Sequence, residues 1–348
     1  MAPREKARPT AADVARLSGV SRTTVSYVLN DNPRQSIPDA TRARVRDAAA
    51  ALGYAPSAVA ASLRRGHSHT VVLVTDSSQY GYTSTDFLEY IGERVTASGY
   101  GVVHHLFSGA DALVDLVAQI VPYGVLSLTT IGLDTAGRLR DLGVRHVYLT
   151  ENAERPGEAA PWELLIGAQQ YGFARDIDPR PLVFVIPPPS DRRAAVALQR
   201  WQGFAAEASD RAEAAPRLLR LTGDATTDAA SVAAVVDGDG AIACAFDDIA
   251  AAMVLTAART VGIPVPRRLA VLGGEEMPFA AFLDPPLSSV RHDAAASGTT
   301  LIETFLQTLT LQHPAVHRLS APLRSAGSLI ERGTTLPREG AAASPGSP

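Results

Sequence analysis

Side chains that can donate hydrogen bonds gather on one side of a short predicted helix near the N-terminus. They are Arg22, Thr23, Ser26 and Tyr27, and at about 100° per residue they lie opposite the apolar side of that helix. Such a face can reach base edges in the major groove of DNA, where an arginine binds guanine through two hydrogen bonds. An ordinary solvated helix face would have the same composition, so the interpretation depends on the elements around it.

Those elements are predicted by the run TAADVARLSGVSRTTVSYVLN, which begins at Thr10. Thr10 and Asp13 have the spacing of a capping box at the start of a helix. Gly19 suits the left-handed conformation that ends a helix, and Ser21 can cap the next one by accepting a backbone N–H. A third helix follows and ends at Gly53. Two short helices joined by a tight turn, with a third behind them, indicate a helix-turn-helix.

Charge is unevenly distributed along the chain. Residues 1–66 carry eleven Arg or Lys against five Asp or Glu, a net charge of +6, whereas the other 282 residues carry 21 against 31, a net of −10. A compact basic head on an acidic body is typical of proteins that bind the phosphate backbone. The charge pattern therefore favours DNA binding over the solvated face.

The stretches ADVARLSGVSRTTVSYVLN and TRARVRDAAAALGYAPSAVAASL closely resemble the head and hinge of the lac repressor family of bacterial transcriptional regulators. The resemblance implies a homodimer that binds a roughly palindromic double-stranded operator with one head per half-site. It puts Arg22 and Thr23 at the two main base-reading positions. Tyr27 stands where many members have Arg, a departure that bears on the operator sequence. The remaining DNA-binding positions that it implies are Thr10, Ser21, Ser26, Asn30, Ser57 and Leu63.

The run SAVAASLRR over residues 57–65 predicts a hinge that is too short to be a stable isolated helix in water. In the resembling family this hinge folds in the minor groove of the operator, and Leu63 matches the leucine that wedges between central base pairs. Such wedges kink the DNA towards the major groove. The alternative for Leu63 is an apolar linker residue that packs on the body.

Beyond the hinge, strand-like apolar runs alternate with helical periodicity. The clearest strand runs are TVVLVT, LVFVI, AIACAF and LAVLG, which begin at residues 70, 182, 241 and 269. Strands separated by helices predict parallel α/β sheets, and the length of the body favours two lobes over one. Ligands of such sheets lie beyond the carboxyl ends of the strands.

The resemblance predicts the fold of this body and the boundaries of the domains. It implies an N-terminal all-α helix-turn-helix head plus an α/β two-lobed, periplasmic-binding-protein-like body with parallel sheets. The lobes of such a body close on a small effector. The predicted divisions are a flexible basic arm (1–9), the DNA-binding domain (10–56), the hinge helix (57–66), the effector-binding and dimerisation body (67–332) and a disordered tail (333–348).

Three residues are the predicted effector-binding set, carried over from the resemblance. Arg200 matches the arginine that holds the ligand, Phe246 takes the place of a ligand-touching Asn, and Glu275 that of a ligand-touching Asp. An arginine and a carboxylate suit the hydroxyl groups of a sugar, which both accept and donate hydrogen bonds. Phe246 can stack on a sugar ring or favour a less polar ligand. The alternative is a surface ion pair between Arg200 and Glu275, which would be worth little.

The sequence contains few signs of an enzyme active site. Cys244 lies inside an apolar strand run, His104 and His105 lack the spacing of a metal site, and the run Gly273–Glu276 is not a phosphate-binding loop. We therefore expect no cofactor, no metal and no catalytic residue. A single cysteine, the absence of an 18-residue apolar run and an N-terminus without a signal-peptide pattern predict a cytoplasmic protein that does not span a membrane.

Three function classes remain open at this stage. The first is an effector-controlled repressor. The second is a regulator of the same fold with a vestigial effector site or a protein partner as its signal, an alternative that Phe246 supports. The third is a binding protein or enzyme that uses the α/β body alone, which the basic head disfavours.

Overall fold

The computed structural model describes residues 9–29, 36–55, 66–75, 82–149, 161–236, 238–318 and 327–336. The chain divides into two compact units, Met1–Ser68 and His69–Pro348. We call the first unit the head and the second the body. The division falls two residues after the predicted end of the hinge at residue 66.

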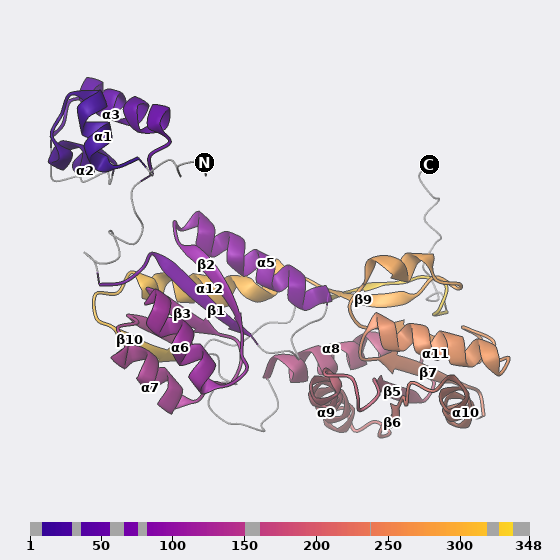
Figure 1. The fold of residues 1–348 in the computed structure, drawn as a ribbon. Coiled ribbons are helices and arrows are strands. Elements are labelled where there is room, and N and C mark those ends of the chain that lie inside the picture. The colour runs from indigo at the N-terminus through magenta and orange to yellow at the C-terminus, as the bar shows by residue number, and fades with distance from the viewer. Residues whose placement is uncertain are drawn as a thin grey trace, which may run out of the picture. The chain divides into compact units, whose positions relative to one another are not determined.

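The head is a bundle of three short helices (Figure 1). They are α1 (Ala11–Ser18), α2 (Arg22–Leu29) and α3 (Asp39–Leu52). The predicted signals at the helix ends are confirmed. Thr10 and Asp13 form the capping box, Gly19 is left-handed with φ 68°, and the Ser21 hydroxyl accepts the Thr24 N–H at 3.0 Å. Gly53, with φ 61°, ends α3 in the same conformation.

The core of the head is small and built from valine and alanine. Val14 of α1, Val25 and Val28 of α2, and Val45 of α3 are at most 1% exposed. These residues follow the predicted apolar stripes, so the opposite side of α2 is left for other contacts. Leu17, three residues after Val14, has the helical spacing of the same apolar stripe, but it is 56% exposed.

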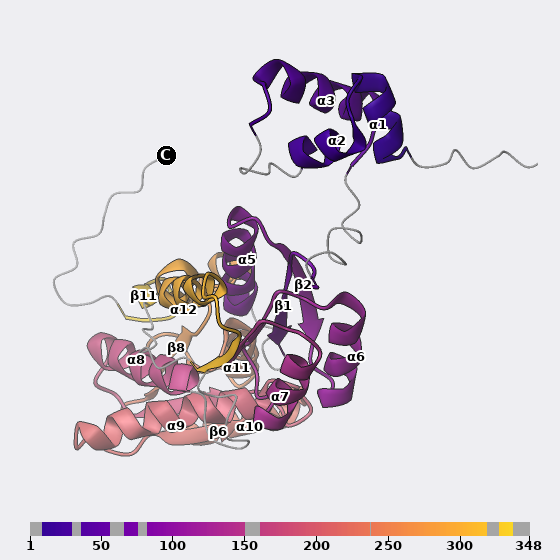
Figure 2. The same cartoon turned by 90° about the vertical axis from the view of Figure 1, so that its left-hand side faces the viewer.

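The first lobe of the body is built around a parallel five-stranded sheet with strand order β10-β4-β3-β1-β2 (Figure 1). Helices α5 and α12 lie side by side over it (Figures 1 and 2), and Tyr90 of α5 is 2.8 Å from Thr299 of α12 between their hydroxyl oxygens. The elements of this lobe are β1 (Thr70–Thr75), α5 (Tyr82–Ala97), β2 (Gly101–Leu106), α6 (Ala110–Ile120), β3 (Gly124–Ser127), α7 (Leu133–Asp141), β4 (His146–Leu149), α12 (Ala294–Leu309) and β10 (Ala315–Arg318).

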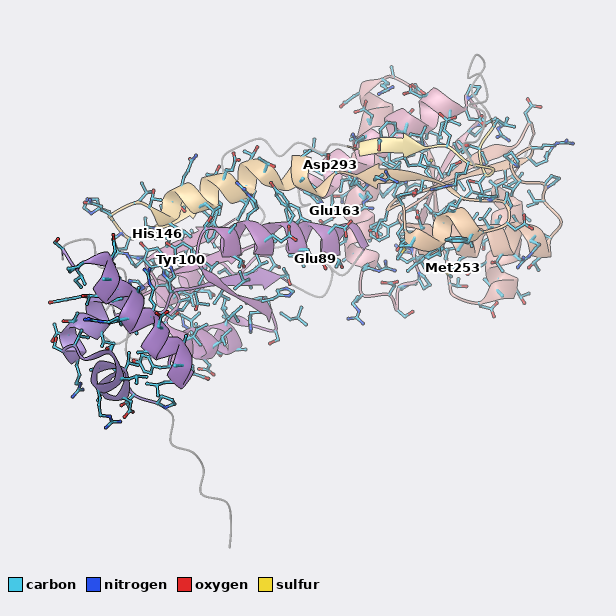
Figure 3. All side chains as sticks on the ribbon, turned by 90° about the horizontal axis from the view of Figure 1, so that it is seen from above. Glu89, Tyr100, His146, Glu163, Met253 and Asp293 are labelled. Atoms are coloured by element: carbon cyan, nitrogen blue, oxygen red, sulfur yellow. The ribbon has the colours of Figure 1, made fainter. Side chains whose placement is uncertain are left out.

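An aromatic row crosses the amino ends of β1, β2, β3 and β4, with its rings stacked except for the tilted pair Tyr123–His146. His69 precedes β1, Tyr100 precedes β2, Tyr123 precedes β3, and His146 begins β4; the successive ring centroids are 4.4, 5.5 and 5.6 Å apart. His317 of β10 continues the row at 5.4 Å, and its Nε2 is 3.1 Å from His146 Nδ1. Figure 3 shows Tyr100 and His146 at the same end of the lobe. The row therefore links the strands of this sheet through side chains, and the Tyr100–Tyr123 contact spans β1, which lies between β2 and β3.

The second lobe contains a six-stranded sheet with order β11-β9-β8-β7-β5-β6, parallel except for the antiparallel pair β11–β9. Its strands β5, β7 and β8 are buried at every position, as their continuous apolar runs predict. The elements of this lobe are α8 (Pro161–Ile177), β5 (Leu182–Ile186), α9 (Ala194–Asp210), β6 (Arg217–Arg220), α10 (Ala225–Val235), β7 (Ala241–Ala245), α11 (Asp248–Thr260), β8 (Leu269–Gly273), the 3-10 helix η3 (Pro278–Phe282), β9 (Ser288–His292) and β11 (Gly327–Ile330).

The chain leaves the second lobe directly after β9. Asp293 caps α12 by accepting the Ala296 N–H at 2.9 Å, and α12 packs in the first lobe. The chain is back in the second lobe at β11. Each lobe therefore contains segments that are far apart in the sequence.

The predicted start of the tail at residue 333 is wrong. Thr334 is fully buried and Thr335 is 4% exposed. The Thr334 hydroxyl donates to the Val271 carbonyl at 2.7 Å and accepts the Ser288 N–H at 2.8 Å. These bonds join the segment to β8 and β9, so the body continues past residue 332.

Candidate functional site

The predicted DNA-contacting face of α2 is accessible. Arg22 and Thr23 are exposed, and Ser26 and Tyr27 are half-buried. All of them lie away from the buried Val25 and its neighbours, as the helical periodicity predicts. The structure therefore brings together the four donors singled out from the sequence.

The other predicted DNA-binding residues fall into two groups. The hydroxyls of Thr10 and Ser21 are exposed but hold the starts of α1 and α2, so they support the face by fixing those helices. Asn30, Ser57 and Leu63 lie outside the residues that the structure describes, as do most of the predicted arm and hinge.

In the body, two glycines bring α8 and α9 into backbone contact. A Cβ on Gly167 would lie 1.9 Å from the Arg200 carbonyl oxygen, and one on Gly203 would lie 2.0 Å from the Leu164 carbonyl oxygen. No side chain fits at either position. The close approach places Arg200 of α9 beside Glu163. Glu163 lies on the first turn of α8 (Figure 3).

The Arg200 guanidinium is buried and already bound by protein groups. Its Nε donates to Glu163 Oε2 at 2.8 Å, and its Nη1 donates to the Phe246 carbonyl oxygen at 2.8 Å. It also lies 4.3 Å from the centroid of the Phe246 ring. Nη2 has no hydrogen-bond partner among the described residues. Arg200 thus keeps one nitrogen for a further contact.

A second arginine lies near the same ring. The Arg193 guanidinium is 5.9 Å from the Phe246 centroid and is held by the carboxylates of Asp191 and Asp247. Asp247 is fully buried and also caps α11, because its carboxylate accepts the Ala250 N–H at 2.7 Å. Hydrogen bonds to Asp191, and then the charges of Asp247 and Asp191, raise the pKa of Arg193 above its ordinary value although burial opposes this.

Glu275 lies in the loop after β8, and a buried carboxylate orders that loop. Asp248 accepts the backbone N–H groups of Gly274, Glu275 and Met277 at 3.0, 3.3 and 2.6 Å. Glu276, which has a left-handed φ of 50°, is bound by Arg332 from the end of the chain. The loop therefore holds Glu275 in a defined position, at the carboxyl end of a strand as predicted.

The surface ion pair between Arg200 and Glu275 is excluded, because the two residues are only 5% and 6% exposed. Phe246 is 2% exposed, so its ring supports the Arg200 guanidinium and is otherwise covered. We call these three residues together with Glu163 and Arg193 the Arg200 cluster.

Two polar side chains beside the cluster have unpaired acceptors. His292 Nε2 donates to the Gly274 carbonyl at 3.0 Å, which leaves Nδ1 as an acceptor without a partner among the described residues. Burial, followed by the charge of Arg200, lowers the pKa of His292 to about 3, so the ring is neutral at pH 7. Gln170 donates to the Ala245 carbonyl at 2.7 Å, and its Oε1 is likewise unpaired.

Glu163, Arg193, Asp247 and His292 were not singled out from the sequence. Asp247 carries a signal that could have identified it, because it follows a strand and precedes an apolar helix, as capping residues do. Glu163 carries none, since its pairing with Arg200 depends on a close helix contact between distant segments.

The residues considered for enzymatic chemistry have structural roles. Cys244 is fully buried in β7, and burial raises the pKa of its thiol. His104 Nε2 lies 2.7 Å from the Thr75 hydroxyl between neighbouring strands. Across the part of the chain that the structure describes, no three His, Cys, Asp or Glu residues are grouped as metal ligands. In the same part, every helix is too short or too polar to cross a membrane.

Two family models match the chain. One, described as bacterial regulatory proteins of the lacI family, matches residues 10–57, which include the capping residue Thr10 and all of α1, α2 and α3. The other, a periplasmic binding protein-like domain, matches residues 136–335 and thus ends beyond the buried Thr334.

Curated relatives match along most of their length. The regulator MalR of Streptomyces coelicolor is 28% identical over 323 residues, covering 85% of this chain and 89% of the relative. The repressor PurR of Vibrio atlanticus is 24% identical, covering 86% and 91%. Both relatives are described as HTH-type transcriptional regulators or repressors, and neither description names an enzymatic activity.

Solved structures show the same fold. A lac repressor dimer bound to operator and the anti-inducer ONPF aligns with a TM-score of 0.68 at 19% identity, covering 95% of this chain and all of that one. A complex of the regulator CelR with cellobiose aligns with a TM-score of 0.54 at 22% identity, covering 94% of this chain and all of that one. The chain belongs to the lacI family of bacterial regulatory proteins and is a DNA-binding transcriptional regulator with a periplasmic binding protein-like body.

Proposed function

We propose that the chain is a repressor that binds a roughly palindromic operator as a homodimer, with the exposed face of α2 in the major groove. The observation that carries the proposal is the grouping of Arg22, Thr23, Ser26 and Tyr27 on one accessible side of α2. The lac repressor dimer of similar fold was solved on its operator. Two heads on paired bodies would contact half-sites separated by a helical turn of DNA or a multiple of it.

A small-molecule effector at the Arg200 cluster completes this proposal. Arg200 Nη2 and the Glu275 carboxylate would bind hydroxyl groups of a sugar, the ligand class seen in the CelR complex. Phe246 would hold the Arg200 guanidinium in place and would not stack on the ligand itself. An effector that prefers one arrangement of the body shifts the population and changes operator affinity by the ratio of its two affinities.

The test is selection of bound fragments from genomic DNA with the purified full chain, read by sequencing. We expect a two-fold symmetric motif, enriched with wild type and lost with Arg22→Ala. Enrichment without any motif would reject sequence-specific recognition. Repeating the selection with a sugar panel, on wild type and Arg200→Ala, tests the effector. One sugar should change operator binding, by release or by tighter binding, and only with wild type.

A second candidate is favoured by one observation. Arg200 is bound by Glu163 and by the Phe246 carbonyl within the protein, and its ring partner Phe246 is covered. A regulator with a vestigial effector site, or with a protein partner as its signal, would have such a cluster, whose hydrogen bonds are made within the protein. In that case no small molecule would change operator affinity, although the motif would still be found.

A further inference from the structure

Arg200 has a carboxylate partner of its own, and that partner is also buried. The side chains of Arg200 and Glu163 are 6% and 12% exposed, and Nε and Oε2 are 2.8 Å apart. The α8–α9 contact at Gly167 and Gly203 fixes the backbones that carry them. The pair is therefore preorganised, and it loses little freedom when it forms.

Both guanidinium groups near the Phe246 ring already have carboxylate partners. Arg193 is bound by Asp191 and Asp247, so it offers little positive charge to a ligand. Arg200 is neutralised by Glu163. Glu275 adds a further buried carboxylate, whose charge acts on Arg193. Neither arginine therefore offers an uncompensated positive charge to an anion.

Two neutral side chains beside the cluster also present hydrogen-bond acceptors. His292 Nδ1 and Gln170 Oε1 are buried acceptors without partners among the described residues, and the histidine is uncharged at pH 7 because of its lowered pKa. Buried acceptors are stabilised by donors. Arg200 Nη2 is a donor that the described residues leave open for a ligand.

We propose that Glu163 is a specificity-determining residue: it occupies Arg200 and makes the effector site select an uncharged or cationic, donor-rich molecule over any phosphate or carboxylate. This inference rests on the proposed function, which places the effector at the Arg200 cluster. It goes further by naming the residue that excludes anionic effectors, including phosphorylated sugars and sugar acids.

The exclusion has a direct physical cause. An anion that took the place of Glu163 would leave a buried carboxylate without its partner, which is strongly unfavourable. An anion beside Glu163 would meet the like charges of Glu163 and Glu275 at short range and low dielectric. A hydroxyl oxygen can instead accept from Arg200 Nη2 while its hydrogen is donated to a carboxylate.

Inorganic phosphate is the probe, titrated into the full chain at constant ionic strength and followed by calorimetry and by the melting temperature. Glu163→Gln keeps the shape of the side chain and removes its charge, so Arg200 becomes an uncompensated buried cation. We expect this variant to bind phosphate about tenfold or more tightly than wild type. Adding Arg200→Gln to it should abolish the gain.

Matched controls separate this effect from general loss of charge. Glu213→Gln removes the acid of the Arg175–Glu213 pair in the same lobe, with Nε and Oε2 2.6 Å apart, and should bind phosphate as wild type does. Glu163→Asp keeps the charge and should continue to exclude phosphate. If Glu163→Gln does not fold, Arg200-dependent binding of phosphate to wild type remains a decisive measurement.

The proposal is overturned if wild type binds phosphate and Arg200→Gln removes that binding, or if folded Glu163→Gln gains nothing over Glu213→Gln. These outcomes differ from failure of the proposed function, because phosphate binding needs neither operator nor natural effector. Conversely, a chain that selects no DNA motif could still show the gain at Glu163.

Discussion

Single residues of the head act through chemistry that their position on α2 makes available. Arg22 is exposed at the first residue of the helix, and Thr23 is exposed beside it. An arginine there can form two hydrogen bonds to guanine, whereas a threonine can contact several bases. Arg22 should therefore carry more of the discrimination between operator and other DNA than its neighbour.

Arg22→Ala is expected to weaken operator binding by about 1–3 kcal/mol, because a bidentate contact to one base is lost. Binding to random DNA should change little. Titration of both DNAs by fluorescence anisotropy, across a range of salt, measures the two losses. Arg16→Ala is the control, since Arg16 lies on α1 and pairs with Asp13. An equal loss on both DNAs would reassign Arg22 to the phosphate backbone.

At the scale of elements, close helix packing creates the Arg200 cluster. Gly167 and Gly203 let the backbones of α8 and α9 touch, and this contact aligns Glu163 with Arg200. The aromatic row in the first lobe has a comparable role, since its rings make contact across the amino ends of β1, β2, β3 and β4.

Gly167→Ala should destabilise the chain by about 1–3 kcal/mol or more, because the new methyl group would overlap the Arg200 carbonyl and force the helices apart. It should also separate Glu163 from Arg200. Gly172→Ala is the matched control on the same helix, where the nearest atom to a new Cβ is Arg211 Nη2 at 3.4 Å. Denaturant melts compare the two, and equal stability would show that the contact can relax.

The aromatic row makes stability depend on pH. Burial, followed by the charges of His317 and Arg145, lowers the pKa of His146 to about 4. The unfolded chain binds a proton near pH 6.5 and the folded chain does not, so stability is lost as the pH falls from about 6.5 towards 4. Between pH 6.5 and 5, protonation of this residue in the unfolded chain can lower the free energy of unfolding by up to about 2 kcal/mol.

His146→Phe should keep the stacking and flatten that dependence. Denaturant melts at pH 7 and pH 5 measure the difference between wild type and variant. The exposed His313, substituted in the same way, should retain the wild-type slope. A variant as acid-sensitive as wild type would mean that other groups cause the loss.

Local patterns predicted much of this architecture. The strands β1, β5 and β8 have the predicted bounds because their apolar runs are continuous and end sharply. The strands β10 and β11 were missed, since each has four residues and depends on a partner far away in the sequence. The charged partners of Arg200 and Arg193 were missed for the same reason: tertiary contacts, and not spacing, bring them together.

At the scale of the whole molecule, recognition of DNA and response to an effector are assigned to different units of the chain. Residues 1–66 carry a net positive charge, and the body contains the buried Arg200 cluster. The hinge that joins them includes Leu63, which lies outside the described residues, and its predicted role as a wedge remains a proposal.

Leu63→Ala is expected to reduce operator bending, because an apolar wedge compensates the cost of unstacking, a few kcal/mol per step, through added contacts. A circular-permutation assay measures the bend angle. Arg22→Ala, tested at saturating protein, should leave the angle unchanged. A wild-type angle in the Leu63 variant would count against the wedge and favour packing of Leu63 on the body.

The crossing of the chain between its lobes also bears on synthesis at the ribosome. The edge strand β10 completes the first sheet, and β11 with Thr334 completes the second, although both sheets begin much earlier in the sequence. Domains generally fold as units during synthesis, from the N-terminus onwards. The head can therefore fold early in synthesis. The sheets of both lobes are complete only after β10 and β11 have left the ribosome. Until β10 and β11 are added, each sheet has an unpaired edge that favours aggregation of the nascent chain.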